Sequence, residues 1–374
     1  MPLSTDRMSL LNHRFAVAQY NTSIKLLIEH AKDKSKDDIR LVTLATCLVF
    51  IHIEFLRGRY ESAISHLRSG ISILSDVVQG VKHQEIERTI ATAFSRLDIQ
   101  CAHFDKSAPF LSYPCGDPGQ FEDANCLATF ASLGEAKTQY DRLLGSTLQL
   151  IRICDEEVER GGRSHISNAV LILRRKNLLD LHRHYIRLID SFSQYPDKTS
   201  DRKVAEAALF LQMQLRLTYI LLSVCMAEDT ERAFDAHIAE FSRIVALAKS
   251  LIYSESNEQN VPIYNRLTYS TDWGVLPPLT FTALKCRDRD IRREATALLA
   301  AWPHREGFWD SALAVQLARQ VVSAEENGLA DRAVGTCCRR ITQVSLKLID
   351  NTDSRHGVAS REWADSELYP TKEY

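Results

Sequence analysis

The chain has 374 residues and a formal net charge of −2, with 45% hydrophobic and 25% charged residues. This length can bury a large core, and the near-neutral charge excludes a global basic field that would draw the protein onto phosphates or anionic membranes. Only 14 Gly and 10 Pro occur, which favours long helices over many short strands. We therefore predict an all-α fold, an irregular stack of antiparallel helices.

The N-terminal residues, MPLSTDRMSL, lack the charged segment followed by an apolar run that is typical of a signal peptide. The longest apolar stretch, residues 41–56, is interrupted by polar side chains, which argues against a membrane span. The nine cysteines are an odd number and include no C-x-x-C pair, so we expect no metal site and no cofactor. Several of them, such as Cys47 and Cys225, lie inside apolar stretches, which predicts a reducing compartment, either cytosol or nucleus.

An αα-hairpin is predicted near the N-terminus. Residues 39–57 are apolar on nearly all sides, Gly58 provides a turn, and residues 60–74 repeat apolar side chains at helical steps. The small residues Ala63 and Gly70 are expected where the two helices cross. The unit is similar to a tetratricopeptide hairpin, but no 34-residue period continues along the chain, so a regular solenoid is not predicted.

Further helices are predicted at approximately 84–104, 132–159, 166–192, 204–226 and 231–251. The Pro- and Gly-rich residues 107–123 and residues 254–278 are expected to be connections between them. We assign residues 1–350 to one helical domain with joints at these two connections, and residues 351–374 to a flexible tail.

Clusters of polar residues were weighed as candidate sites. His182 and His184 lie two apart on a helix, about 200° around its axis, so they cannot share a metal ion, and both are expected to be exposed or partly buried. Glu54 lies in an apolar helix and is expected to pair with a basic neighbour. The basic residues between 285 and 293 alternate with acidic ones, which predicts an intramolecular ion-pair network rather than a phosphate site.

The stretch PHREGFWDS, residues 303–311, could hold an acid, a base and an aromatic wall, or could be a corner between two helices. Pro303 is expected to end one helix, and the next is expected to run from about Trp309 to a C-terminal cap at Gly328. Asp310 would lie in its first turn. The corner motif consists of Arg305, Glu306, Gly307 and Trp309; we expect the two charged side chains to pair with the helices that the corner joins, and the motif to be structural.

The C-terminal residues 361–374 place Trp363, Leu368 and Tyr369 among acidic side chains. This composition is typical of disordered activation segments. A docked or frayed tail is the more frequent explanation of such a terminus.

Three blocks of sequence resemble a known family: ATCLVFIHIEFLRGRYESAISHLRSGISIL at 45–74, LPPLTFTALKCRDRDIRREATALL at 276–299 and PHREGFWDSALA at 303–314. They are similar to the helical C-terminal regulatory region of fungal zinc-cluster transcription factors, and the resemblance extends over residues 12–350. It implies a nuclear, non-enzymatic regulator of transcription that binds protein partners or a small effector and forms homodimers or heterodimers.

The six-cysteine module with which that family binds zinc and DNA has no counterpart in this sequence. We therefore do not expect direct DNA binding, and a DNA-binding regulator of the same family is a candidate partner. Two alternatives remain: a shortened form of a full zinc-cluster factor, and an α-helical enzyme whose catalytic residues are too far apart in the sequence to recognise.

Overall fold

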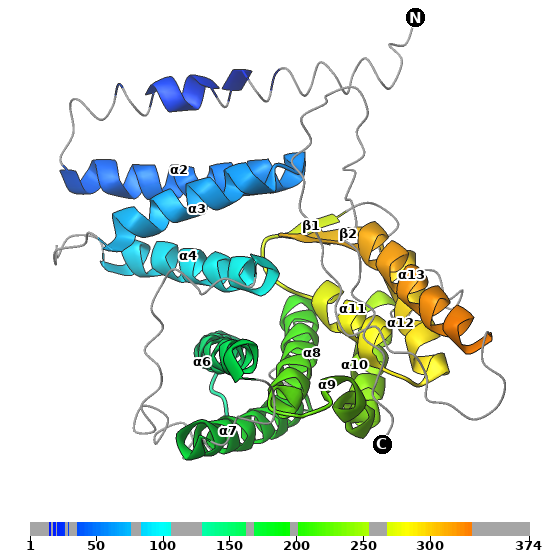
Figure 1. The fold of residues 1–374 in the computed structure, drawn as a ribbon. Helices are drawn as coiled ribbons and strands as arrows, with labels where there is room; N and C mark the ends of the chain where they lie inside the picture. The colour runs from blue at the N-terminus through cyan, green and yellow to red at the C-terminus, as the bar shows by residue number, and fades with distance from the viewer. Residues whose placement is uncertain are drawn as a thin grey trace, which may run out of the picture. The chain divides into compact units, whose positions relative to one another are not determined.

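The structure is a computed structural model (Figure 1). It describes scattered residues between 15 and 29 and then residues 36–75, 84–105, 129–161, 168–194, 201–253 and 268–330. These residues are almost entirely helical, which confirms the predicted all-α class, and one small sheet accompanies the helices. The chain divides into two compact units, Met1–Leu97 and Asp98–Tyr374, which are described separately.

The first unit is built on the predicted hairpin of α2 (Lys36–Arg57) and α3 (Tyr60–Ser75). Gly58 has a φ of +70°, and α2 ends in a Schellman motif: the Gly58 N–H donates to the Phe55 carbonyl at 3.1 Å and the Arg59 N–H to the Glu54 carbonyl at 2.9 Å. The Glu54 side chain pairs with Arg57 at 2.8 Å, as predicted for this buried carboxylate.

One detail of the predicted hairpin is wrong. A Cβ added to Gly70 would lie 2.2 Å from the Phe94 ring on α4 (Gln84–Asp105), so Gly70 allows α4 to approach, rather than α2. The sequence pattern could not distinguish these partners, because a glycine marks a close approach without identifying the approaching segment.

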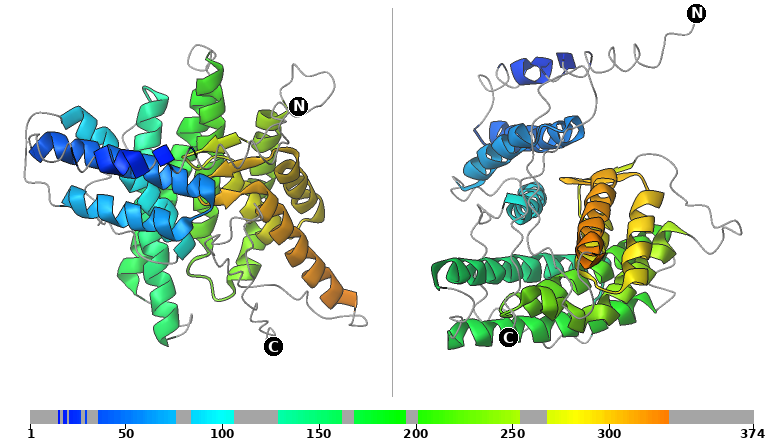
Figure 2. Two further views of the ribbon diagram at one scale, coloured as in Figure 1. Left: turned by 90° about the horizontal axis from the view of Figure 1, so that it is seen from above. Right: turned by 45° about the vertical axis from the view of Figure 1, so that its right-hand side comes forward.

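The second unit surrounds one long apolar helix, α8 (Arg202–Val224). Helices α6 (Leu133–Gly161), α7 (Ala169–Ser193), α10 (Ile238–Ile252) and α11 (Leu276–Lys285) all pack against it (Figure 2). Asn168 caps α7 and Asp201 caps α8, each accepting a backbone N–H from two residues further on. The short α9 (Thr230–Ala233) and the 3-10 helix η3 (Phe234–His237) precede α10. The helix predicted at 231–251 is therefore divided into three elements.

Among the described helices, α2 and α8 are long and apolar enough to cross a membrane by length and composition. The core helix of a soluble protein passes the same test. The apolar window of α8 is 67% buried within the protein, whereas that of α2 is 28% buried. The apolar character of α8 therefore follows from the helices that enclose it.

The predicted corner between two helices joins α12 (Arg289–Ala301) to α13 (Ser311–Ala330), and it contains two short strands of a three-stranded sheet that was not predicted. Strand β1 (Thr268–Ser270) pairs in parallel with β2 (His304–Glu306), and β2 pairs antiparallel with β3 (Trp309–Asp310). Strands β2 and β3 lie between α12 and α13 in the chain, whereas β1 precedes α11.

Three helix boundaries in this region differ from the prediction. Helix α11 begins at Leu276. Its two prolines occupy the first turn, where a backbone N–H would have no carbonyl partner within the helix. Helix α13 begins at Ser311 rather than at Trp309, because Trp309 belongs to β3. Gly328 lies within α13, so it is not the C-terminal cap.

Candidate functional site

Glu306 is the most deeply buried group of the corner motif, with 0% of its surface exposed. Its carboxylate accepts backbone N–H groups from Gly274 and Val275 at 2.8 Å and from Leu276 at 3.2–3.3 Å, at the N-terminus of α11. These N–H groups have no partner within the helix and carry its partial positive charge. Glu306 therefore anchors α11 to β2, whereas we had expected it to pair with the helices that the corner joins, α12 and α13.

Two glycines allow these close approaches. A Cβ on Gly274 would lie 2.7 Å from the Glu306 carboxylate, so only glycine lets the carboxylate reach the backbone there. Gly307 has a φ of +53°, and a Cβ at this position would also lie 2.7 Å from Oε1 of Gln100. The Gly307 N–H donates to the Ser270 carbonyl at 3.1 Å, which closes the turn between β2 and β3 onto β1.

Arg305 and Asp310 form the outer side of the corner. The Arg305 guanidinium donates to Asp310 at 2.8 Å. The other oxygen of Asp310 accepts the N–H groups of Ala312 and Leu313 at 3.0 and 3.2 Å. Asp310 therefore caps α13 from outside the helix, instead of lying in its first turn as predicted.

The aromatic residues fill the inside of the corner. Trp309 is buried, with its ring 6.5 Å from that of Phe281 on α11. Trp302 stacks on His304 at 4.4 Å between ring centroids, and its indole N–H donates to Thr268 at 3.0 Å. His304 in turn lies 2.5 Å from the Thr268 hydroxyl and 3.3 Å from the Glu306 carboxylate.

The corner contains an acid and a histidine side by side, but their contacts are those of a packing element. Both oxygens of Glu306 accept backbone N–H groups, and His304 is held between Trp302 and Thr268. Among the described residues, no group of three or more His, Cys, Asp or Glu side chains could hold a metal ion. The arrangement suits positioning α11 and α13 better than transferring a proton to a substrate.

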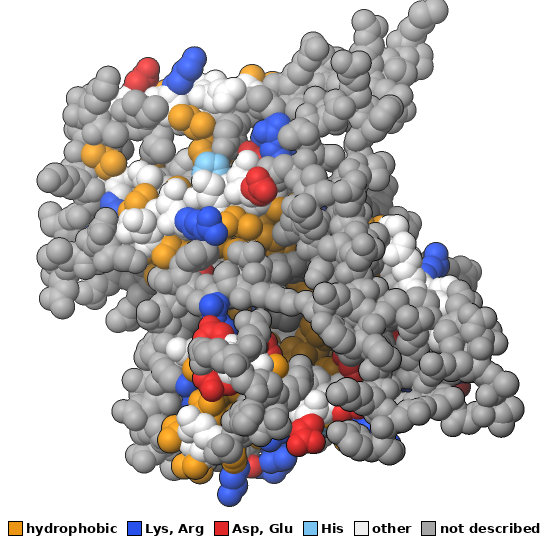
Figure 3. Space-filling view, viewed as in Figure 1, with side chains coloured by type: hydrophobic (Ala, Val, Ile, Leu, Met, Phe, Trp, Pro, Cys, Tyr) orange, Lys and Arg blue, Asp and Glu red, His pale blue; other side chains and the backbone are white. Residues whose placement is uncertain are grey.

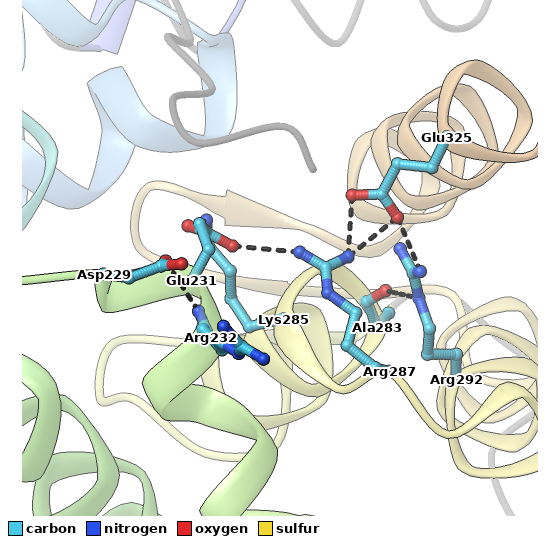
Figure 4. A network of polar contacts seen from close by, with 8 residues as sticks. All are labelled: Asp229, Glu231, Arg232, Ala283, Lys285, Arg287, Arg292 and Glu325. Atoms are coloured by element: carbon cyan, nitrogen blue, oxygen red, sulfur yellow. Dashed lines mark hydrogen bonds and ion pairs between the residues drawn. The ribbon is translucent and has the colours of Figure 1, made fainter. Parts of the chain in front are cut away.

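An ion-pair network joins α9, the end of α11, the start of α12 and α13 (Figure 4). Glu231 on α9 pairs with Lys285 and, at 3.0 Å, with Arg287, and Glu325 on α13 pairs with Arg287 and Arg292 at 2.7 Å each. All five side chains are at most 16% exposed. The predicted intramolecular network is confirmed.

The partners in this network are not the interleaved acids. The two carboxylates come from positions 33 to 56 residues away from the basic residues. Asp288 instead caps α12 through the N–H groups of Asp290 and Ile291. Asp290 pairs with Arg293 on the surface, and Glu294 pairs with Lys249.

A second buried polar cluster connects α6, α7 and α8. His182 was expected to be exposed or partly buried but is fully buried, with Nδ1 2.8 Å from the Leu178 carbonyl and Nε2 3.2 Å from the Thr218 hydroxyl. Burial lowers the pKa of His182 to about 4 and raises the pKa of Tyr140, which also contacts Thr218, well above its usual range. The sequence feature that indicates burial of His182 is its position on an apolar helical stripe, four residues after Leu178.

The tail residues Trp363, Leu368 and Tyr369 lie outside the described residues. The four corner residues, in contrast, come together around the small sheet. On the face shown in Figure 3, basic and acidic side chains are interspersed, without a patch of one sign among the described residues.

Comparison with known proteins gives one informative relative. The chain is 23% identical, over an alignment 395 positions long, to the "aspercryptin biosynthesis cluster-specific transcription regulator atnN" of Emericella nidulans. The match covers 84% of this chain and 63% of the relative, so it spans less than two thirds of the relative's length. No family model and no solved structure matches the chain.

Proposed function

We propose that this protein is a transcriptional regulator whose helical region resembles that of fungal zinc-cluster factors and controls the genes of a pathway. The observation that carries the proposal is the similarity to a cluster-specific transcription regulator over 84% of the chain. The resemblance of residues 45–74, 276–299 and 303–314 to the same class of regulator supports it.

A non-enzymatic role is part of the proposal. The charged groups of the corner motif and the ion-pair network are used in contacts between helices, so they serve packing within the chain. The proposed activity is therefore binding, in the nucleus, to protein partners or to a small effector, by a homodimer or a heterodimer.

The proposed route to genes runs through a DNA-binding regulator of the same family rather than through direct contact with DNA. The net charge of −2 and the mixed charges of the face in Figure 3 support this route, because DNA binding draws most of its affinity from clustered basic side chains.

The experiment is a titration of the purified chain onto duplex DNA at two salt concentrations, beside a fusion with a zinc-cluster module upstream. We expect no specific binding by the chain and specific binding by the fusion. The regulatory role is tested by expressing the tagged chain in cells and measuring its recruitment to promoters by chromatin immunoprecipitation. Specific DNA binding by the chain alone, or absence of any promoter or regulator in the precipitate, would overturn the corresponding part of the proposal.

A second candidate is a shortened form of a full zinc-cluster transcription factor. The observation in its favour is that more than a third of the relative's length lies outside the match. Mapping the 5′ end of the transcript separates the two candidates, since an in-frame upstream segment with six cysteines would establish the longer form.

The tail is proposed to activate transcription. Residues 350–374 fused to a neutral DNA-binding domain are expected to activate a reporter, and replacing Trp363, Leu368 and Tyr369 by alanine is expected to abolish this activity while leaving the acidic residues in place. A silent wild-type fusion would indicate a tail without this role.

A further inference from the structure

One side of α2 is apolar and open to solvent. Helix α3 packs on α2 within the same unit (Figure 1). Over residues 39–57 of α2, the exposed side chains are Val42, Ala45, Val49 and Leu56, and every one of them is apolar. The three larger ones are 45%, 55% and 52% exposed. The exposed face of a helix normally carries polar side chains, so this face indicates a contact surface.

The other group of exposed apolar residues in the described part of the chain is limited to the first turn of α7. Val170, Ile172 and Leu173 lie there, and the exposed residues that follow, Lys176 and Asn177, are polar. The face of α2, in contrast, continues from Val42 to Leu56, which is about 21 Å of helix. It is therefore long enough to pack along a second helix.

The spacing of these residues makes the face self-complementary. Val42 and Leu56 lie seven residues before and after Val49, as in the seam of a coiled coil. Two such helices can lie antiparallel with a two-fold axis at Val49. Val49 then meets its counterpart, and Val42 of each copy meets Leu56 of the other. A contact between identical surfaces requires this symmetry about its centre.

The charged residues near the ends of α2 are compatible with an antiparallel pair. Asp38 is exposed and lies on the same line of the helix as Val42 and Ala45, whereas Arg40 lies about half a turn around the axis from them. Asp38 precedes Val49 by eleven residues and Arg59 follows it by ten. In the antiparallel pair, Asp38 of one copy therefore approaches Arg59 of the other.

The described residues that precede α2 do not close this face. Those between 15 and 29 are themselves exposed apart from the half-buried Ile24, with Phe15 at 66% and Leu26 at 49%. The face of α2 therefore remains available to another molecule, and its symmetry and lack of exposed charge suit a second copy of the same helix.

We propose that α2 pairs antiparallel with α2 of a second copy of this chain, through Val42, Ala45, Val49 and Leu56. The pair forms the homodimer interface of the proposed regulator, and it rests on that proposed function for its role. A seam of this length makes a small interface, so the dimer dissociates reversibly. Association is measured without DNA or promoters, so a failure of the dimer and a failure of the proposed function are distinguishable.

The first test is sedimentation equilibrium of the purified full-length chain over a wide range of concentration. We expect a concentration-dependent change from one chain to two. Val49→Glu places two carboxylates against each other at the two-fold axis and should raise the dissociation constant by more than about tenfold. Leu173→Glu, the same change at another exposed apolar residue, is the matched control and should leave the dissociation constant unchanged.

The second test is cross-linking with a short bismaleimide, in a Cys47→Ser background because Cys47 is half-buried on the same helix. Val49→Cys should cross-link to itself. Val42→Cys should not, because its two copies lie about 21 Å apart along the antiparallel pair. A mixture of Val42→Cys and Leu56→Cys chains should cross-link, and the background chain alone sets the reference level.

The proposal would be overturned by a wild-type chain that is monomeric at every concentration. If Val49→Cys of that monomer also resisted alkylation, the face would belong to the chain's own residues; if Val49→Glu lost promoter recruitment, it would belong to a different protein. A dimer unaffected by Val49→Glu, or self-linking of Val42→Cys, would equally overturn it. Circular dichroism establishes that each variant is folded, and wild-type sedimentation together with the conservative Val49→Cys decides the question if Val49→Glu is not.

Discussion

Removing the Glu306 carboxylate should destabilise the second unit more than any surface charge change. Glu306→Ala leaves three buried backbone N–H groups at the start of α11 without their acceptor and removes a negative charge from the helix N-terminus. Glu306→Gln keeps a side chain of similar shape with one oxygen acceptor, but it loses the charge and places an amide NH₂ against backbone donors.

The magnitude follows from these contacts. A hydrogen bond to a charged group contributes about 1.5–3 kcal/mol, and a buried donor left unpaired costs about 1–3 kcal/mol. Because the three bonds share one carboxylate and are not additive, we expect a loss of about 4 kcal/mol for Glu306→Ala and about 2 kcal/mol for Glu306→Gln. The first value lies near the upper end for single substitutions.

The assay is urea unfolding followed by tryptophan fluorescence. Trp273, Trp302 and Trp309 are buried around the corner, so their emission reports on the unit that contains Glu306. Glu294→Gln is the matched control: Glu294 is 42% exposed and pairs with an exposed Lys249, so its loss should change the free energy of unfolding by less than about 0.5 kcal/mol.

Two results would refute this reasoning. A cost below about 1 kcal/mol for Glu306→Ala would mean that the carboxylate does not hold α11 in place. Equal stability of Glu306→Gln and the wild type would mean that the negative charge contributes nothing at the helix N-terminus, contrary to the expected effect of the helix dipole.

Gly307→Ala, at a φ of +53°, should cost about 1–3 kcal/mol in the same urea assay. Gly134→Ala on α6, where the added Cβ would make only an ordinary contact of 3.8 Å with the Ser132 hydroxyl, should be neutral or stabilising, and equal effects would contradict the strained turn. The folded pKa of His182, about 4, lies below its unfolded value of 6.5, so stability should fall as pH falls between them. From about pH 7.5 to about pH 5, the wild type should lose about 2 kcal/mol that His182→Gln does not lose, and parallel pH profiles would refute this. Glu325→Gln leaves two buried guanidinium groups poorly paired and should cost about 2–3 kcal/mol, compared with less than about 0.5 kcal/mol for the exposed Asp290→Asn; thermal and urea unfolding should both show this difference.

The helices were predictable because their signals are local. The apolar repeat at 166–192 predicted α7, observed at Ala169–Ser193, and the repeat at 132–159 predicted α6, observed at Leu133–Gly161. The turn at Gly58 was also local, since a helix end needs a residue that tolerates positive φ. Each of these features depends on neighbours within a few residues.

The strands of the corner were not predicted because their pairing depends on a distant segment. Strands β2 and β3 contain three and two residues, too few to show a period of two, and β2 pairs with β1 more than thirty residues earlier. The sequence PHREGFWDS indicated a turn and three charged residues, Arg305, Glu306 and Asp310. They could not show that Glu306 reaches α11.

The sequence by itself determined which helix faces are apolar, where the turns fall and that the charges between 285 and 293 would be used internally. Only the tertiary structure decided which groups meet: Glu306 with the start of α11, and Arg287 with Glu231 and Glu325. The physical reason is that periodicity and turn chemistry act over a few residues of backbone, whereas pairs dozens of residues apart are selected by how whole helices pack.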